Sequence, residues 1–282
     1  MKIITLGTGG PRPDAERGSA CTVLEVGGKY LYFDTGRGVV RSTAQKGIPF
    51  KDIAALFLTH HHVDHIGELP DFMISSWLSG RRGAPLPAFG PPGTAGIYQV
   101  LMEQVYDKDL EFRTEGEKVF GRFDHAEFRE VKTGPVAEVA GCRVSCEEMT
   151  HGHGLPFGQK FLSRWTCLGY RIEAEGKVVT ISGDSVMSEA LLRLARGSDL
   201  HVQCCYMAAS DLTDPHFKRV SQHTLACSDT VGKIAAAAGV KKLVLTHFRH
   251  MAPDKLAEIE RDVRADFAGE VFLARDLDEF PA

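Results

Sequence analysis

The 282-residue sequence lacks the features that mark membrane, secreted and disulfide-stapled proteins. No apolar run approaches the ~18 residues that a membrane-spanning helix requires. The N-terminal run Ile3–Leu6 is too short for a signal peptide. The seven cysteines are odd in number and form no CxxC pair, which favours reduced thiols. We therefore expect a cytoplasmic protein without a membrane partner, folded as a single domain over residues 1–282.

A strong basic charge is also missing. Lys and Arg number 33 against 37 Asp and Glu, which gives a net charge of −4. A dedicated nucleic-acid binder usually has a global basic field, so the balance argues against a nucleic-acid partner, although a local basic patch stays open. With 43% hydrophobic and 25% charged residues, the chain has the composition of a globular protein with a sizeable core.

Short apolar runs alternate with helical patterns along the whole chain, which predicts an α/β layered fold. The predicted helices cover Thr94–Tyr106, Ser188–Arg196, His223–Ala238 and Lys255–Asp266. The predicted strands are Ile3–Leu6, Thr22–Val26, Tyr30–Phe33, Ile53–Leu58, Val144–Met149, Leu168–Ile172, Val178–Ile181, Leu200–Gln203 and Leu243–Leu245. Two segments rich in Gly, Pro and basic residues, Gly80–Pro92 and His151–Trp165, are expected to be loops near a site.

The densest group of chemically reactive side chains follows the predicted strand Ile53–Leu58. It contains His60, His62, Asp64 and His65 within six residues. In an extended segment, the spacing of His60 and His62 places both rings on one side. A set of three histidines and one aspartate suits one or two borderline-soft divalent cations, with zinc first among them. The sequence therefore predicts a metal site after this strand.

Three further candidate ligands each follow a predicted strand. His151, Asp184 and His247 come just after the runs that end at Met149, Ile181 and Leu245. In open α/β sheets, ligands gather outside the carboxyl ends of the strands. We therefore expect these three side chains to join the histidine cluster in one shared site.

The motif HxHxDH at 60–65, with these three residues, resembles the metallo-β-lactamase superfamily, whose fold is an αββα four-layer sandwich. The resemblance implies that Asp34-Thr35-Gly36 supports the metal loop. Four further motifs are similar to the branch that contains ribonuclease Z and arylsulfatase-like hydrolases: Leu6-Gly7-Thr8-Gly9, Gly90-Pro91-Pro92-Gly93, Gly169-Tyr170-Arg171-Ile172 and His223-Thr224. Within that branch, Leu69-Pro70-Asp71, Trp77, Gly80-Arg81 and the pattern from Tyr106 to Arg113 look more like the arylsulfatase type.

The resemblance also implies two divalent metal ions and their ligands. One ion would take His60, His62 and His151, the other would take Asp64, His65 and His247, and Asp184 would bridge them. His153 remains an alternative to His151. His61 is expected to point away from the ions, and His250 to lie at the surface although a proton-donor role stays open. Zinc is the default metal, with Mn or Fe as alternatives.

Two such cations can hold a bridging hydroxide that attacks an ester. Asp64 is expected to accept a proton in this reaction. His223 is expected to bind the anionic oxygens of the substrate, unless it is an ordinary residue at a helix start. Related enzymes are commonly homodimers, so a homodimer is expected by analogy.

The substrate prediction rests on differences from ribonuclease Z, whose members carry a long Gly/Pro-rich arm after the GYRI-like strand. Here only a tight turn fits between Ile172 and Val178, and Gln203-Cys204-Cys205-Tyr206 replaces a His-Glu pair. These differences favour a small anionic or aryl ester as substrate, an organosulfate or a phosphodiester. A lactone or carboxylic ester is the second choice; tRNA 3′ processing and a non-catalytic, thiol-sensing or metal-binding protein rank lower. The basic residues Arg81, Arg82, Lys160 and Arg164 would steer the anion, unless they form only a solvated charged rim. The aromatic residues Trp77, Phe157, Phe161 and Trp165 suggest an aryl leaving group, with the alternative that some of them only pack the bases of the loops.

Overall fold

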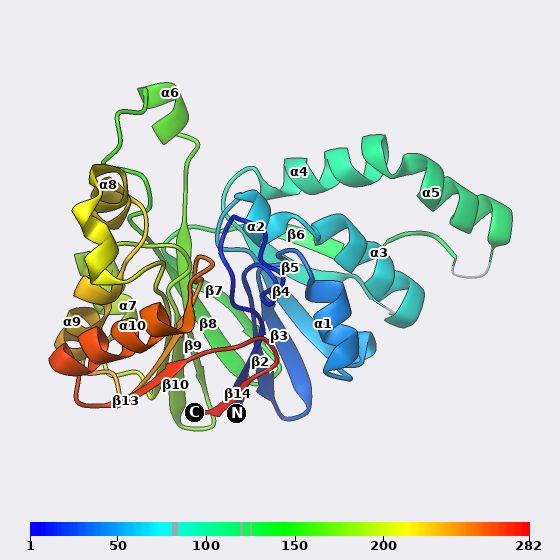
Figure 1. Ribbon diagram of the computed structural model, residues 1–282. Helices are drawn as coiled ribbons and strands as arrows, with labels where there is room; N and C mark the ends of the chain where they lie inside the picture. The colour runs from blue at the N-terminus through cyan, green and yellow to red at the C-terminus, as the bar shows by residue number, and fades with distance from the viewer. Residues whose placement is uncertain (81–83, 119–120, 125) are drawn as a thin grey trace.

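Two seven-stranded mixed sheets face each other and carry helices on their outer faces (Figure 1). The computed structural model describes residues 1–80, 84–118, 121–124 and 126–282. The first sheet has the order β14-β1-β2-β3-β4-β5-β6 and the second the order β13-β12-β11-β10-β9-β8-β7. The predicted αββα sandwich is therefore confirmed.

The first sheet joins the two ends of the chain. Its strands are β1 (Lys2–Gly7), β2 (Cys21–Val26), β3 (Lys29–Phe33), β4 (Ile53–Phe57), β5 (Leu86–Gly90), β6 (Ala126–Glu130) and β14 (Glu279–Pro281). β1 pairs antiparallel with β14 and β2, whereas β3 to β6 pair in parallel. Lys2 lies opposite Pro281, so the two termini meet at the same edge (Figure 1).

The second sheet changes from antiparallel to parallel pairing near its middle. Its strands are β7 (Gly134–Val139), β8 (Cys142–Glu148), β9 (Leu168–Ala174), β10 (Lys177–Ile181), β11 (Leu200–Cys204), β12 (Lys242–Thr246) and β13 (Glu270–Leu273). β7 to β10 pair antiparallel, and β10 to β13 pair in parallel. The turn from β9 to β10 needs only Glu175 and Gly176, both at positive φ, so the tight turn expected there is confirmed.

An apolar core fills the space between the sheets, because the inward positions of both sheets are apolar. Phe33 and Phe57 of the first sheet stack at 5.0 Å between ring centroids, and Tyr170 of the second sheet lies 5.5 and 5.4 Å from them. The Tyr170 hydroxyl donates to the carbonyl of Leu58 at 2.7 Å, which pairs the buried oxygen. The rings of Phe33, Phe57 and Tyr170 therefore bring the ends of β4 and β9 together.

The outer layers consist of α1 and α3 over the first sheet and α7, α9 and α10 over the second (Figure 1). Gly232 of α9 lies so close to α10 that a Cβ atom would meet the carbonyl oxygen of Val263 at 2.7 Å, so only glycine fits there.

The helices are α1 (Val39–Gln45), η1 (Phe50–Asp52), α2 (Val63–Ile66), α3 (Leu69–Gly80), α4 (Thr94–Val100), η2 (Leu101–Val105), α5 (Asp107–Glu111), η3 (Phe112–Glu117), α6 (Gln159–Leu162), α7 (Glu189–Ala195), η4 (Ala209–Thr213), α8 (Pro215–His223), α9 (Ser228–Ala238) and α10 (Pro253–Asp266). In the described part of the chain, no helix is both long enough and apolar enough to cross a membrane.

All nine predicted strands are present, but two predictions about the segments between them are wrong. The expected loop Gly80–Pro92 contains the buried strand β5, which the sequence hides because Pro87 lies inside it. The expected helix His223–Ala238 is two helices: His223 ends α8, and α9 begins only at Ser228 because the intervening Leu225–Cys227 segment packs into the core. Arg81 and Arg82, expected to steer an anion, lie outside the described residues.

Candidate metal centre

The seven predicted ligands meet between the two sheets, at one end of the sandwich. Four of them lie on the loop and the short helix α2 that follow β4. The other three follow β8, β10 and β12 of the second sheet. The predicted gathering at the strand ends therefore brings together side chains that are up to 187 residues apart in the chain, from His60 to His247.

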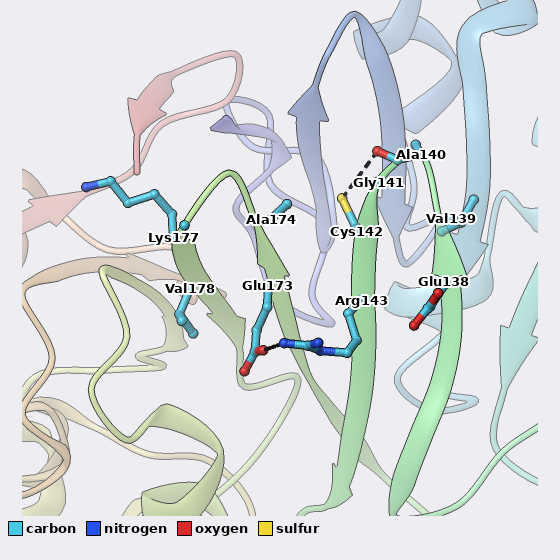
Figure 2. Close-up of a pocket in the computed structure, with 11 residues that line it drawn as sticks. Glu138, Val139, Ala140, Gly141, Cys142, Arg143, Glu173, Ala174, Lys177 and Val178 are labelled. Atoms are coloured by element: carbon cyan, nitrogen blue, oxygen red, sulfur yellow. Dashed lines mark hydrogen bonds and ion pairs between the residues drawn. The ribbon is translucent and has the colours of Figure 1, made fainter.

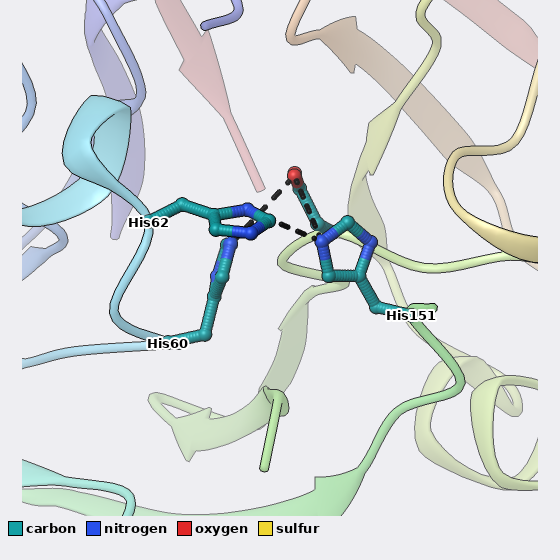
Figure 3. Close-up of side chains that lie close together, drawn as sticks. His60, His62 and His151 are labelled. Atoms are coloured by element: carbon teal, nitrogen blue, oxygen red, sulfur yellow. Dashed lines mark hydrogen bonds and ion pairs between the residues drawn. The ribbon is translucent and has the colours of Figure 1, made fainter. Parts of the chain in front are cut away.

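The first group comprises His60, His62, His151 and Asp184. Figure 3 shows the three imidazole rings turned toward one another and toward a carboxylate oxygen. His62 Nδ1 lies 3.3 Å from His151 Nε2. Asp184 Oδ2 lies 3.8 Å from His60 Nε2 and 3.9 Å from His151 Nε2. The four side chains therefore surround one point.

The second group comprises Asp64, His65 and His247. His247 Nε2 lies 3.2 Å from Asp64 Oδ2 and 3.3 Å from His65 Nε2. Asp184 also faces this group, because its Oδ1 lies 3.2 Å from His247 Nε2 and 3.5 Å from His65 Nε2. One oxygen of Asp184 thus faces each group, as a carboxylate shared by two cations would.

The donor atoms fit divalent cations better than they fit one another. His60 Nε2 is fully buried and finds no hydrogen-bond partner among the described residues. Four ligands at zinc–nitrogen distances of ~2.0–2.1 Å would lie roughly 3.3 Å apart in a tetrahedron. One separation in the first group, 3.3 Å, and two in the second, 3.2 and 3.3 Å, match that spacing, whereas Asp184 lies 3.8 and 3.9 Å from its neighbours in the first group. The residues therefore have the donor types that suit a divalent cation.

In three of the buried rings the other nitrogen is held by a fixed partner, whereas His247 Nδ1 has no hydrogen-bond partner among the described residues. Asp34 Oδ2 accepts hydrogen bonds from His65 Nδ1 at 2.7 Å and from the Thr59 hydroxyl at 2.8 Å. His60 Nδ1 donates to the Thr59 hydroxyl at 3.0 Å, and His151 Nδ1 donates to the carbonyl of Thr224 at 2.6 Å. These bonds select the tautomer that leaves Nε2 free to coordinate a cation.

The backbone is strained at two positions that serve these groups. Asp34 and His247 adopt φ values of +66° and +61°, in the left-handed region that costs free energy for residues other than glycine. Both residues keep this conformation while their side chains take part in the cluster. The supporting role of Asp34 was predicted from the sequence, but those of Thr59 and Thr224 were not. Thr224 accepts through its backbone carbonyl, which any residue type offers, so the motif His223-Thr224 does not mark it as a ligand partner.

Burial and local charge set the protonation states of the cluster. Burial holds the pKa of His60 well below its usual range and lowers the pKa of His62 to about 4. Burial opposes ionisation of Asp184, but His247 and His65 outweigh it and hold its pKa well below the usual range. Near neutral pH His60 and His62 are therefore neutral and Asp184 is ionised, the forms that coordinate metal ions. Burial opposes protonation of His65 and His247, but Asp184 outweighs it and raises the pKa of both rings, so these two rings must lose a proton when a cation binds.

The structure places His151, not His153, in the cluster. His153 Nδ1 instead accepts a hydrogen bond from the backbone N–H of His151 at 3.1 Å. His61 points away, as expected, and pairs with the Thr94 hydroxyl at 2.7 Å. His250 pairs with Asp14 at 3.0 Å and its side chain is exposed, so its expected surface position is confirmed.

His223 lies beside the cluster rather than in it. It is the last residue of α8, so the alternative that placed it at a helix start is wrong. Its ring packs against Gly154, where a Cβ atom would come within 2.4 Å of Nδ1. Its carbonyl accepts a hydrogen bond from the backbone N–H of Gly152 at 2.6 Å. His223 therefore sits against the loop that carries His151.

Three of the four aromatic residues expected near the site are there. Trp165 lies 4.9 Å from His62 between ring centroids, and Phe161 and Phe157 follow it. Trp77 is not there, because it is buried in the cluster that joins α3 to the α4–η3 segment and contacts Phe123 at 5.2 Å.

The cysteines offer no exposed thiol. All seven are buried and form no disulfide. Burial raises the pKa of the Cys204 thiol to about 11, so it stays protonated and unreactive near neutral pH. These features contradict a thiol-based sensor role for Cys204 and Cys205.

A hollow of about 560 Å³ lies at the end of the second sheet opposite to the ligand groups (Figure 2). Hairpin residues of β7–β8 and β9–β10 line it, and an ion pair between Arg143 and Glu173 crosses it. The thiol of Cys142 donates to the carbonyl of Ala140 at 3.9 Å. This hollow contains no histidine and no converging set of donors, so the site lies at the strand ends and not here.

Comparison with known proteins agrees with this geometry. Residues 29–248 match the family model described as Beta-lactamase superfamily domain. The chain is 28% identical to a ribonuclease Z of Mycobacterium bovis over 282 residues, covering 98% of this chain and 96% of that protein. It is 30% identical to a ribonuclease Z of Mycolicibacterium paratuberculosis, with the same coverage.

Solved structures share the fold over nearly the whole chain. The metallo-beta-lactamase fold protein YhfI from Bacillus subtilis has a TM-score of 0.75 at 20% identity, covering 99% of this chain and 98% of its own. The short form of human tRNase Z has a TM-score of 0.74 at 21% identity, covering 100% and 99%.

These relatives contradict the expectations of a small-ester substrate and of no nucleic-acid partner. Both expectations relied on the missing arm and on the net charge. The arm is indeed absent at the β9–β10 turn, but its absence leaves the ligand groups complete. Net charge averages over the whole chain and does not report the basic residues near one site.

Proposed function

Because this chain belongs to the beta-lactamase superfamily, as a metallo-β-lactamase-fold hydrolase of the ribonuclease Z branch, we propose that it is an RNA endonuclease that removes 3′ trailers from transfer-RNA precursors. The observation that carries the proposal is the pair of ligand groups that share Asp184. Such a pair suits the hydrolysis of a phosphodiester bond. The names of the relatives supply the substrate.

The proposed ligands follow the two groups. His60, His62 and His151 would hold one zinc ion, and Asp64, His65 and His247 would hold the second, with Asp184 shared. Mn or Fe could take the same His and Asp donors. When bound, two cations supply an activated water and neutralise charge on the phosphate.

The chain's own residues have separate tasks in this proposal. Burial opposes ionisation of Asp64, but a hydrogen bond from His247 outweighs it and lowers the pKa of Asp64. Asp64 is therefore an ionised acceptor for the proton that leaves the attacking water. His223 lies against the loop that carries His151, and in this proposal it would contact a phosphate oxygen of the substrate.

Two exposed basic residues on the helix that ends at His223 support an RNA substrate despite the net charge of −4. Lys218 and Arg219 are exposed on α8, a helix whose residues Pro215–His223 include no acidic side chain. Such residues attract the phosphate backbone and release counterions when the RNA binds.

The test is incubation of the zinc-loaded protein with a transfer-RNA precursor that carries a 3′ trailer. The proposal expects one endonucleolytic cut and a cleavage rate that falls steeply as salt rises. The Asp184→Ala variant is the control for contaminating nucleases. A protein that binds two zinc ions and leaves the precursor intact would disprove the proposed function.

A further inference from the structure

Three aromatic side chains form a continuous ladder along the segment 151–165, here called the aromatic loop. Phe157 and Phe161 lie 4.3 Å apart between ring centroids, and Phe161 stacks on Trp165 at 5.3 Å with planes 23° apart. Trp165 in turn lies 4.9 Å from His62, a member of the first ligand group. The ladder therefore begins at the candidate metal centre and leads away from it.

The inner end of the ladder is fixed and the outer end is open. Trp165 Nε1 donates to the carbonyl of His151 at 2.7 Å, and Trp165 packs against the core of the second sheet's helices. Phe157 and Phe161 belong to none of the core clusters of the described residues, and Phe157 is 42% exposed. In Figure 1 the helix α6 of this loop projects beyond the ends of the two sheets.

The charged side chains of the aromatic loop itself are basic, and one carboxylate, Glu148, lies 3.8 Å from His153 Nε2 at its base. The aromatic loop contains no Asp or Glu, and Lys160 and Arg164 are exposed on it. Its base is bonded to the last residue of α8 through the Gly152 N–H and the His223 carbonyl, so it lies against the helix that carries Lys218 and Arg219. Aromatic faces beside cations are the features that bind unpaired nucleotides: the rings stack on bases, and the cations attract phosphates.

We propose that Phe157, Phe161 and Trp165 bind unpaired nucleobases next to the phosphodiester bond that is cut. This inference rests on the proposed RNA cleavage and specifies how the substrate is held: by bases stacked on this loop. The stacking tolerates any base sequence, because every base has an aromatic face. If the three rings only held the loop together, RNA and a base-free chain would bind equally well, and loss of a ring would slow the cleavage of large and small substrates equally.

The first experiment measures binding through Trp165. The chain has two tryptophans, and the other, Trp77, is buried against Phe123, so Trp77→Phe leaves Trp165 as the fluorescent reporter. The probe is a six-nucleotide single-stranded RNA, compared with an abasic ribose–phosphate chain of equal length and charge. The RNA should quench Trp165 and bind about tenfold more tightly than the abasic chain. Equal affinity would overturn the proposal, because phosphate contacts alone would then explain binding.

The second experiment measures kinetics on two substrates. Phe157→Ala should raise KM for a precursor with an unpaired trailer about tenfold and leave kcat unchanged, and Phe157→Tyr should restore KM. Hydrolysis of methyl p-nitrophenyl phosphate should not change in either variant. The matched control is Phe112→Ala on η3, which removes an aromatic ring that is 64% exposed on the α4–η3 segment, away from the aromatic loop (Figure 1).

The outcomes separate this inference from the proposed function. If the wild-type protein cuts no RNA, the proposed function fails whatever the variants do. If it cuts RNA and Phe157→Ala has the wild-type KM, the ladder proposal alone fails. If Phe157→Ala slows both substrates equally, the ladder supports the structure of the site and does not bind bases, which also overturns the proposal.

Discussion

Two buried regions of this molecule contain histidine, and they satisfy its nitrogen atoms in opposite ways. His201, on β11, pairs Nδ1 with the Thr180 hydroxyl at 2.8 Å and Nε2 with Gln203 Oε1 at 2.9 Å. At the candidate metal centre, His60 pairs only Nδ1. His151 pairs Nδ1 with a backbone carbonyl, and its Nε2 meets only another member of the group, His62 Nδ1 at 3.3 Å. All three rings are almost completely buried. Burial therefore does not distinguish a ligand from a structural histidine, whereas the second nitrogen does.

The same burial has different consequences in the two regions. Burial lowers the pKa of His201 to about 4 and keeps it neutral, and its two hydrogen bonds satisfy that neutral ring. Burial also keeps His60 neutral, but its Nε2 remains without a partner among the described residues. An unpaired polar atom in a protein interior costs free energy unless something binds it. The candidate metal centre retains this cost, which a bound cation would offset.

The largest expected effect is on the residue that joins the two ligand groups. Asp184→Ala removes the carboxylate that faces both groups, so we expect the metal content to fall below two ions per chain. RNA cleavage should fall on the order of a thousandfold, because metal-ion stabilisation contributes several kcal/mol to the reaction. Metal analysis and single-turnover cleavage check this together. Full metal content with full activity would show that Asp184 does not bridge.

The next effect concerns His201, whose two ring nitrogens both have hydrogen-bond partners. It appears in the free energy of unfolding and not in the activity. In the unfolded chain, His201 titrates near pH 6.5, whereas in the folded protein its pKa is about 4. Between these values the unfolded state binds the extra proton, so stability falls as pH falls from 6.5 to 4, by roughly 3 kcal/mol. His201→Gln removes the titration. Urea unfolding at several pH values should show a steeper loss for the wild type, and equal slopes would contradict the assignment.

A smaller effect is expected where a carboxylate orients the rings. Asp34→Asn keeps the side-chain shape and tolerates the left-handed backbone, but it removes the negative charge that accepts from His65 and Thr59. Metal affinity should fall about ten- to a hundredfold. Competition with a chelator measures this affinity. A variant that binds zinc as tightly as the wild type would show that the Asp34 charge has no part in orienting the ligands.

The smallest expected effect is that of His153→Ala, which we compare with His151→Ala on the same loop. His151→Ala should lose a metal ligand and with it most of the cleavage activity. His153→Ala removes only an acceptor for a backbone N–H, so activity should change less than about threefold. Parallel cleavage assays and metal analysis test the pair. The reverse order of effects would assign the ligand to His153.

Local pattern predicted the strands with a plain apolar run or a clear alternation. It missed β5, which contains Pro87, and the more exposed strands β6 and β14. β4 and β11 have apolar runs that are almost fully buried, and a run of that kind is visible in any context. β6 alternates partly buried with exposed positions, and β14 has three residues, so neither has a signal strong enough to separate it from a loop. Their strand conformation depends on pairing with β5 and β1, which only the folded sheet provides.

The sequence by itself determined the histidine cluster, because His60, His62, Asp64 and His65 lie within six residues and local backbone geometry orients them. It also determined that further ligands follow strands. Only the tertiary structure decided which side chains complete the site. His151 rather than His153 faces His62, the two oxygens of Asp184 face separate groups, and Trp77 is buried elsewhere. These choices depend on contacts between segments far apart in the chain, and such contacts form only when the two sheets pack together.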